Sequence, residues 1–561
     1  MQLTDRRRRF YLYAREAWRR VSRRLVVGRI SAMRFSGNGP DRLIVAPTDL
    51  RAVDPFVAEE ILEGRFVLAG RVLETHGRSP FSLELPSRIF AERLHSFSWL
   101  RHIRASRNDV ACANARNIVD GWIEMHGRRI FGIAWDPDVI AQRIIAWLSH
   151  STVALHGAEG GFYRRFMKSL AFQIRYLKLI APYTPDGEVR LRVRIALALA
   201  SVSMPVRAAI IKREGQNLDY EIERQILPDG GHVSRDPRAA LNLLLDLLPL
   251  RQTYINLGHD VPARLIPAID RMYPALRFFR HQGGDLALFN GATATLANEL
   301  MSVLRYDETA GQPFKALPHI NYHRLSAGQT VVLMDTGFPQ SVELSRSAHA
   351  GCLSFEMSSG KYRFIINCGS PKFAGKTYRQ MSRATAAHST VTLNETSSSR
   401  LSSSRFLGPV IISGVKSVTV NRREDGNGGD WLTAAHDGYV KNFGYRHERE
   451  IGINAAGTKI KGRDRFIRPE PASRLGDGAV RACIRFHIHP AIALVREDDE
   501  TVSLQAPDGD NWMFAAPGLN VAITDDVFFA DASGMRASQQ IEIEFSVAER
   551  PEIHWVLTRS E

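Results

Sequence analysis

The spacing of apolar residues changes once along the chain, near Leu304, and this change limits the possible fold. Between Ala111 and Leu304, apolar residues recur at steps of three and four, which predicts a succession of helices. After Leu304, short runs such as TVVLMD, YRFIIN and QQIEIEFSV alternate with a period of two, which predicts strands of an antiparallel sandwich. We therefore expect an α+β multidomain protein, with a helical domain followed by a β domain.

The boundary between the helical and the β region is expected between Tyr306 and Pro318, where the apolar residues show no regular spacing. A chain of 561 residues is also too long for one compact core. We predict a basic N-terminal arm over residues 1–43, a helical domain over 44–310 and a β domain over 311–561.

Composition limits the class of protein. Hydrophobic residues make up 44% of the chain, yet no uncharged apolar run reaches eighteen residues, so no membrane-spanning segment is expected. The four cysteines have no paired spacing. Cys352 and Cys368 can join across neighbouring strands, but free buried thiols are the stronger expectation, and the redox compartment stays open.

The N-terminal arm holds much of the positive charge. Residues 1–34 carry eleven arginines against Asp5 and Glu16, which is +9 of the chain's formal +15. Phe10, Trp18 and Leu25 recur at helical spacing among these arginines, and a basic amphipathic helix can lie on anionic lipid. The alternative is a terminal helix docked on the body. The arm lacks the apolar core of a secretory signal, and no aromatic-basic motif indicates nucleic-acid binding.

The stretch from Ser347 to Asn394 contains polar side chains that can bind a metal ion or take part in catalysis. Three strand-like runs, 349–357, 362–368 and 387–394, can pair side by side. This pairing would turn His349, Asn367 and His388 into one pocket, with nitrogen and oxygen ligands suited to zinc. The alternative is that the two histidines are hydrogen-bonded neighbours with no metal.

This stretch resembles the C-terminal domain of the heparinase II/III family of polysaccharide lyases. The family's H-A-H…S-F, D-x-G and R-x-T-x-A-H-N-T patterns are similar to the chain at Ala348–Ala350, Ser354–Phe355, Gly369, Arg383, Thr385, Ala387–His388 and Thr390. Other segments of the chain are also similar to the family and occur in the family's order: LHSFSWL, RQILPDGGH, HDGY, RFHIHP and IHWVLTR. The resemblance spans most of the chain, and its order is more specific than any one piece.

The resemblance implies an incomplete α/α toroid before the β-sandwich, and a lyase that cuts a uronate-containing polysaccharide by β-elimination. That reaction requires a base, a group that neutralises the carboxylate and a proton donor. The chain departs from the family pattern where these groups are expected. Gly187–Glu188 stands in place of Asn-His, Ala239 in place of the Tyr, Ser347 in place of the first His of H-A-H and Asn367 in place of the Asp of D-x-G.

Other residues in the same segments are candidates for the missing roles. His232 is the candidate base, Arg235 the candidate carboxylate ligand and Tyr378 the candidate proton donor, with Arg379 and Arg383 as candidate substrate-binding residues. The alternatives are a loop histidine, a surface arginine and a packed tyrosine.

The sequence is compatible with two functions. The first is a lyase on an acidic polysaccharide, with His349, Asn367 and His388 holding one divalent metal, zinc or calcium. The second is a catalytically silent glycan-binding or envelope-assembly protein on the same scaffold. The family suggests a location in the cell envelope, in the periplasm or at the membrane periphery. His487 and His489 share a strand face that permits metal binding, but a structural role is favoured.

Overall fold

The computed structural model describes residues 2–27, 39–106, 108–309, 311–339, 341–469 and 479–560. The chain forms two compact units, each built from several segments. The first unit contains Met1–Ile226, Leu241–Asp270 and Asn298–Glu308. The second contains Leu227–Ala240, Arg271–Ala297 and Thr309–Glu561. The second unit therefore takes two segments from the helical part of the sequence, and one of them carries the candidate residues His232 and Arg235.

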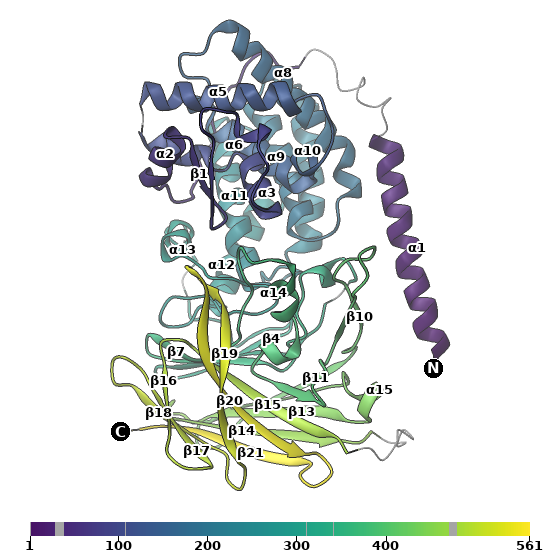
Figure 1. Ribbon diagram of the computed structural model, residues 1–561, viewed down its shortest axis with the longest axis vertical. Coiled ribbons are helices and arrows are strands. Elements are labelled where there is room, and N and C mark those ends of the chain that lie inside the picture. The colour runs from purple at the N-terminus through teal and green to yellow at the C-terminus, as the bar shows by residue number, and fades with distance from the viewer. Residues whose placement is uncertain are drawn as a thin grey trace. The chain divides into compact units, whose positions relative to one another are not determined.

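Helices dominate the chain up to Leu304, as the apolar spacing predicts (Figure 1). On α8, for example, Phe166, Leu170 and Leu177 are fully buried at steps of four and seven. None of the helices in the described ranges is long and apolar enough to cross a bilayer. The α-helices are α1 Gln2–Val27, α2 Pro55–Leu62, α3 Arg88–Ser96, α4 Leu100–Ser106, α5 Asp109–His126, α6 Pro137–Ser149, α7 Ser151–Ala154, α8 Gly160–Ile180, α9 Glu188–Ser203, α10 Ala208–Gln225, α11 Pro237–Asn256, α12 Leu265–Phe278 and α13 Ala297–Leu304.

Short elements connect these helices and the later strands. They are the hairpin β1 Arg65–Leu68 and β2 Arg71–Glu74, the 3-10 turns η2 Pro80–Ser82, η3 Ile133–Trp135, η4 Ala181–Tyr183, η5 Leu344–Arg346 and η6 Thr385–Ala387, and the helices α14 Lys376–Met381 and α15 Val440–Phe443. A second small sheet pairs β9 Arg400–Leu401 with β10 Ile411–Ser413.

Two large antiparallel sheets form the body of the second unit. The eight-stranded sheet has the order β11 Val418–Glu424, β12 Asp430–His436, β13 Arg446–Ile453, β14 Lys459–Ile467, β21 Glu552–Arg559, β18 Asn511–Ala515, β17 Thr501–Gln505 and β16 Ala493–Arg496. The nine-stranded sheet has the order β19 Val521–Asp531, β20 Gly534–Ser546, β15 Arg481–Ile488, β7 Tyr362–Ile366, β6 Phe355–Ser359, β5 Thr330–Asp335, β4 Tyr322–Ala327 and β3 Ala316–Leu317, with β8 Val391–Leu393 also on β15.

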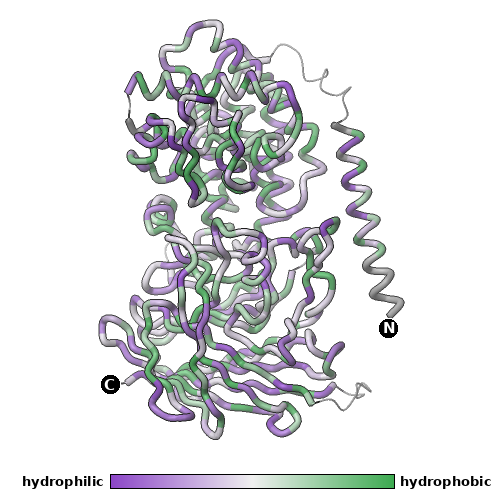
Figure 2. The backbone as a smooth tube through the Cα atoms, in the orientation of Figure 1, coloured by the Kyte–Doolittle hydropathy of each residue, from purple (hydrophilic) through white to green (hydrophobic). Residues whose placement is uncertain are grey.

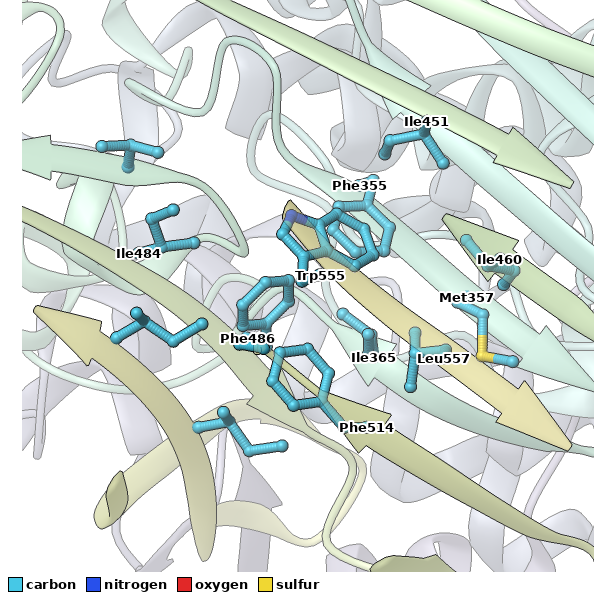
Figure 3. Packing of buried hydrophobic residues seen from close by; sticks show 14 of the residues in the cluster. Phe355, Met357, Ile365, Ile451, Ile460, Ile484, Phe486, Phe514, Trp555 and Leu557 are labelled. Carbon is cyan, nitrogen blue, oxygen red and sulfur yellow. The ribbon is translucent and has the colours of Figure 1, made fainter. Parts of the chain in front are cut away.

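The two sheets share one apolar core, which makes them a sandwich. Trp555 on β21 stacks on Phe355 of β6 with ring centroids 5.5 Å apart, and it meets Phe486 of β15 edge-on at 5.1 Å (Figure 3). These three side chains are almost fully buried and come from both sheets. The loops at the edges of the sandwich therefore extend from one tightly packed core.

The predicted hairpin within residues 347–394 is confirmed, because β6 and β7 pair across Gly360. The third run does not join this hairpin. β8 pairs with Ala482–Ile484 of β15, while β7 pairs with His487–Ile488 of the same strand. The expectation of three strands lying side by side is therefore wrong. His349 and His388 lie in loop segments outside the strands.

The N-terminal arm is a helix, α1, over Gln2–Val27. Arg29 and Arg34, which also belong to the predicted arm, lie outside the described residues. Leu12 on α1 is buried, whereas Phe10, Trp18 and Leu25 are 76%, 72% and 77% exposed. Figure 2 shows hydrophilic and hydrophobic bands alternating along the coloured part of this helix. The apolar stripe predicted from the sequence thus faces solvent.

Candidate functional site

The turn at Asp229–Gly231 fixes the start of the loop that carries His232 and Arg235. Gly230 adopts φ +80°, and a Cβ atom there would lie 1.8 Å from the carbonyl oxygen of Arg271. Only glycine fits this position. The Asp229 carboxylate accepts hydrogen bonds from the backbone N–H groups of His319 and Ile320, at 2.8 and 3.2 Å. The loop is therefore tied to the segment that enters β4.

His232 is buried, and its Nδ1 atom lies 2.7 Å from Ser234 Oγ. The backbone N–H of Ser234 also donates to Nδ1, at 3.2 Å. A nitrogen that accepts from a backbone N–H carries a lone pair, so the ring proton of neutral His232 is on Nε2. The Nδ1 lone pair is thus already in use within the loop.

Arg235 is buried in the second unit and pairs with Asp335 at the end of β5. Its guanidinium also donates to the carbonyl oxygens of Ile320, at 2.8 Å, and Asn321. The guanidinium carbon lies 4.8 Å from the centre of the Tyr322 ring, which is a cation–π distance. Burial works against the charge on Arg235, but the ion pair with Asp335 holds its pKa above the ordinary value.

Asn290 links this ion pair to His349. The Asn290 side-chain amide donates to Tyr322 Oη at 2.6 Å and to Asp335 Oδ2 at 3.0 Å. Its carbonyl oxygen accepts a hydrogen bond from the backbone N–H of His349 at 3.2 Å. One buried amide therefore joins β4, the end of β5 and the loop of His349.

His349 and His388 lie against each other, with His349 Nδ1 and His388 Nε2 3.1 Å apart. His388 Nδ1 donates to the carbonyl oxygen of Ala384 at 2.7 Å, because a carbonyl can only accept. His388 Nε2 therefore presents a lone pair. A Cβ atom at the neighbouring Gly291 would lie 3.9 Å from both His349 Nε2 and Asp236 Oδ2, so both groups lie next to Gly291.

Burial keeps both imidazoles neutral at physiological pH. Desolvation lowers the pKa of His349 well below its ordinary value, and the neighbouring His388 and Arg383 lower it further. Desolvation likewise lowers the pKa of His388 to about 4. Neutral imidazoles are the form that binds metal ions. Two nitrogens 3.1 Å apart suit zinc bonds of about 2.0–2.1 Å, whereas calcium prefers oxygen ligands.

Asn367, the third predicted metal ligand, is completely buried beside this pair. Its side-chain oxygen accepts a hydrogen bond from the backbone N–H of Ser389, the residue after His388, at 3.1 Å. Its amide donates to Glu356, which also contacts His281. Asn367 is thus held within a buried polar network. Its place in a metal site stays a prediction.

Arg383 and Arg379, the two predicted substrate-binding residues, have different surroundings. The guanidinium of Arg383 is buried and donates to the carbonyl oxygens of Ser345, Ala348 and Pro409, at 2.7 to 2.8 Å. Burial lowers the pKa of Arg383 to about 10. Because Ala348 precedes His349, Arg383 positions that histidine. Arg379 lies on α14 and is exposed.

Tyr378, the predicted proton donor, also lies on α14 and is 43% exposed. Its ring centroid is 6.5 Å from that of Phe529 on β19. Lys376, Tyr378 and Arg379 together give α14 an exposed surface with two positive charges and one aromatic ring, which we call the α14 patch.

Sequence reasoning missed Asn290, Tyr322, Asp335 and Glu356. The sequence carries a signal for two of these residues, Asp335 and Asn290. Asp335 ends an apolar strand and is followed by Thr336–Gly337, and Asn290–Gly291 is a turn pair that follows an apolar run. His487 and His489 have separate contacts, since His487 lies beside Cys368 and His489 beside Arg363 and Phe528.

A family model described as "Heparinase II/III-like, C-terminal" matches residues 309–556. A curated relative from Caulobacter vibrioides, "FtsZ-localized protein C", is 31% identical over 552 residues, which is 94% of this chain and 93% of the relative.

Solved structures of the same fold include heparinase III, with a TM-score of 0.71 at 14% identity over 94% of this chain and 88% of that one. A heparan sulfate lyase mutant from Pedobacter heparinus matches with a TM-score of 0.63 at 14% identity, over 97% of this chain and 89% of that one. These matches confirm the predicted order of a helical toroid and an antiparallel β-sandwich.

Proposed function

The chain belongs to the heparinase II/III-like family, and on that basis we propose that it is a catalytically silent envelope-assembly protein that binds an acidic polysaccharide. The proposal rests on the contacts made by the side chains that were predicted to act in catalysis. In the loop after Gly231, the Arg235 guanidinium is taken up by Asp335 and by backbone carbonyls. The Nδ1 atom of His232 accepts from Ser234.

A lyase needs these groups to meet the substrate. A guanidinium that neutralises a buried carboxylate cannot also neutralise a uronate without leaving Asp335 as an unpaired buried charge, which costs several kcal/mol. The departures from the family pattern at Gly187, Ala239, Ser347 and Asn367 point the same way. The scaffold supports binding better than β-elimination.

The Caulobacter relative supplies the cellular context of the proposal. Its name states that it is localized with FtsZ, and it aligns with this chain over nearly the full length of both. We infer that this protein also associates with FtsZ, at the membrane periphery. Co-sedimentation with FtsZ from the organism that encodes this chain tests the inference directly. The protein is expected in the pellet with FtsZ filaments formed in GTP, and in the supernatant with FtsZ in GDP. Recovery in the supernatant in both nucleotides would remove this part of the proposal.

The α14 patch is the proposed contact with the polysaccharide. Lys376 and Arg379 offer positive charge to uronate carboxylates, and the exposed Tyr378 ring offers a face for a sugar. Affinity electrophoresis in gels containing an acidic polysaccharide measures this contact. Arg379→Ala is expected to weaken binding several-fold, and more so at low salt. The exposed Arg496 on β16 offers a matched control, since Arg496→Ala should bind like the unmodified protein. Equal loss in both variants would show a contact with total charge and not with α14.

A second candidate function is the lyase itself, favoured by the two neutral imidazoles of His349 and His388. In that hypothesis His232 is the base, Arg235 holds the uronate carboxylate and Tyr378 protonates the leaving oxygen. A zinc ion held by His349, Asn367 and His388 would add positive charge beside the substrate. Cleavage gives an unsaturated uronate that absorbs in the ultraviolet, so turnover separates this function from binding alone.

Helix α1 is the proposed contact with anionic lipid. Its exposed stripe of Phe10, Trp18 and Leu25 can enter the lipid interface while neighbouring arginines meet the headgroups. Such a contact would keep the protein at the membrane periphery. If α1 does not bind lipid, the proposed contacts with polysaccharide and FtsZ are unaffected.

A further inference from the structure

Cys368, His487 and Asp526 bring three metal-binding atoms together in the nine-stranded sheet of the second unit. The thiol sulfur, the imidazole Nδ1 and a carboxylate oxygen all lie within 4.8 Å of one another. His487 Nδ1 is 2.7 Å from Asp526 Oδ2 and 3.2 Å from Cys368 Sγ, and that sulfur is 3.5 Å from the same carboxylate oxygen. One ring nitrogen thus faces both other groups.

The register of four neighbouring strands explains why these residues meet. His487 on β15 is opposite Ile366 of β7 on one side and Gln540 of β20 on the other. Cys368 follows Ile366 by two residues, and Asp526 on β19 follows Thr524, the partner of Gln540, by two residues. Residues two apart on a strand share a face. The three side chains therefore emerge on one face of the sheet, held by its backbone ladder.

We propose that this cluster is a zinc-binding site distinct from the His349 and His388 pair. The combination of a thiolate, an imidazole and a carboxylate suits zinc, whereas a thiolate argues against calcium and magnesium. Binding would displace the thiol proton of Cys368 to solvent and leave the His487 ring with its proton on Nε2. Three protein ligands leave a fourth position of a tetrahedral ion for water.

The surroundings of the cluster allow an ion to reach it. Cys368 and His487 are 1% exposed, but the Asp526 side chain is 14% exposed, so the cluster meets solvent on the carboxylate side. The backbone around it is fixed, because the N–H groups of Phe529 and Ala530 on β19 both donate to the carbonyl oxygen of Cys368, at 2.8 and 3.2 Å. Bound zinc would join the end of β7 to β15 and β19.

Burial raises the pKa of the Cys368 thiol well above its ordinary value, and the Asp526 carboxylate raises it further. Without a cation the thiol is therefore protonated. Burial opposes the charge on Asp526, but the neighbouring His487 holds the pKa of this carboxyl below its ordinary value. The site thus offers an ionised carboxylate to attract an ion, and an ion that binds the sulfur must displace the thiol proton.

Cobalt substitution tests the proposal in the full-length protein. The metal-stripped chain is titrated with Co²⁺, and a thiolate-to-cobalt charge-transfer band in the near ultraviolet is expected at one ion per chain. Cys368→Ser should lose the band, whereas Cys352→Ser and Cys483→Ser, which alter two other buried thiols, should keep it. His349→Ala should also keep the band, because the two sites share no ligand. Unchanged absorption in Cys368→Ser, or no band in the unmodified protein, would overturn the assignment.

A second pair of variants covers the case in which Cys368→Ser fails to fold. Asp526→Asn replaces the partly buried carboxylate ligand by an amide, and Asp525→Asn changes the adjacent, exposed aspartate on β19. Competition with a zinc chelator should show an affinity at least about tenfold weaker for Asp526→Asn, by analogy with the loss on removing even an outer partner of a metal ligand. Asp525→Asn should match the unmodified protein. Equal zinc affinity in the two variants would contradict the site.

Discussion

The buried ion pair between Arg235 and Asp335 holds the loop after Gly231 against the end of β5. Replacing Asp335 by Ala leaves the Arg235 charge buried without its partner. We expect the free energy of unfolding to fall by about 3–5 kcal/mol. Equilibrium denaturation in urea, followed by tryptophan fluorescence, measures this change.

Asp499→Ala is the matched control for that experiment. Asp499 pairs with Arg496, and both side chains are largely exposed. An exposed pair contributes at most about 1 kcal/mol. Similar losses in the two variants would mean that the Arg235–Asp335 pair does not stabilise the fold as its burial indicates.

His95 gives the first unit a pH-dependent stability. The Trp122 indole N–H donates to His95 Nδ1 at 3.1 Å, so that nitrogen must stay unprotonated. Burial, with help from His126 and Arg143, lowers the pKa of His95 to about 3. Between pH 6.5 and about 3 the unfolded chain therefore binds a proton that the folded chain does not. Stability should be full above pH 6.5 and fall with decreasing pH, by about 2 kcal/mol from this group between pH 7 and pH 5.

Unfolding curves at pH 7 and pH 5 for the unmodified protein and His95→Gln measure this effect. The variant is expected to lose less stability than the unmodified protein over this interval. His76→Gln, at an exposed histidine, should keep the full pH dependence. An identical slope in all three proteins would contradict the assigned pKa.

Single side chains divide into those that a sequence can place and those that it cannot. His349 and His388 could be paired in advance because both belong to a family pattern. Arg235 could be nominated, but its partner Asp335 lies 100 residues away and no local spacing connects them. The role of Asn290 could not be predicted from the sequence either, because it depends on contacts with Tyr322, Asp335 and His349 that form only in the folded chain.

Helix α1 is the element that we propose contacts anionic lipid. We expect the full chain to float with anionic liposomes at low salt, because lipid would cover Phe10, Trp18 and Leu25. Raising the salt should weaken the contact by screening the arginines. A chain lacking residues 1–34 should stay in the unbound fraction. Equal behaviour of the two chains toward anionic lipid would exclude this helix as the contact.

The strands show which elements a sequence can predict. Helices up to Leu304 and the hairpin of β6 and β7 follow from local spacing and a Ser-Ser-Gly turn. The partner of β8 does not, because β15 lies about ninety residues further along the chain and pairs with both β7 and β8. The cluster of Cys368, His487 and Asp526 depends on that same long-range register.

For the molecule overall, the family explains the fold and leaves the reaction open. The chain keeps the order of helical and β segments found in heparinase III at 14% identity, because hydrophobic spacing is enough to preserve a scaffold. Catalysis depends instead on a few side chains. In the second unit, Arg235 and Arg383 are buried and bonded to groups of the protein itself.

The measurement that addresses this account most directly follows binding and turnover in the same samples. The purified protein is incubated with heparan sulfate, alginate, hyaluronan and bacterial exopolysaccharides. Binding is scored by affinity electrophoresis and cleavage by the ultraviolet absorbance of the unsaturated uronate. We predict binding to at least one acidic polysaccharide with no rise in absorbance, and the same binding after His232→Ala. A rise in absorbance that His232→Ala or Tyr378→Phe abolishes would contradict the account and establish a lyase.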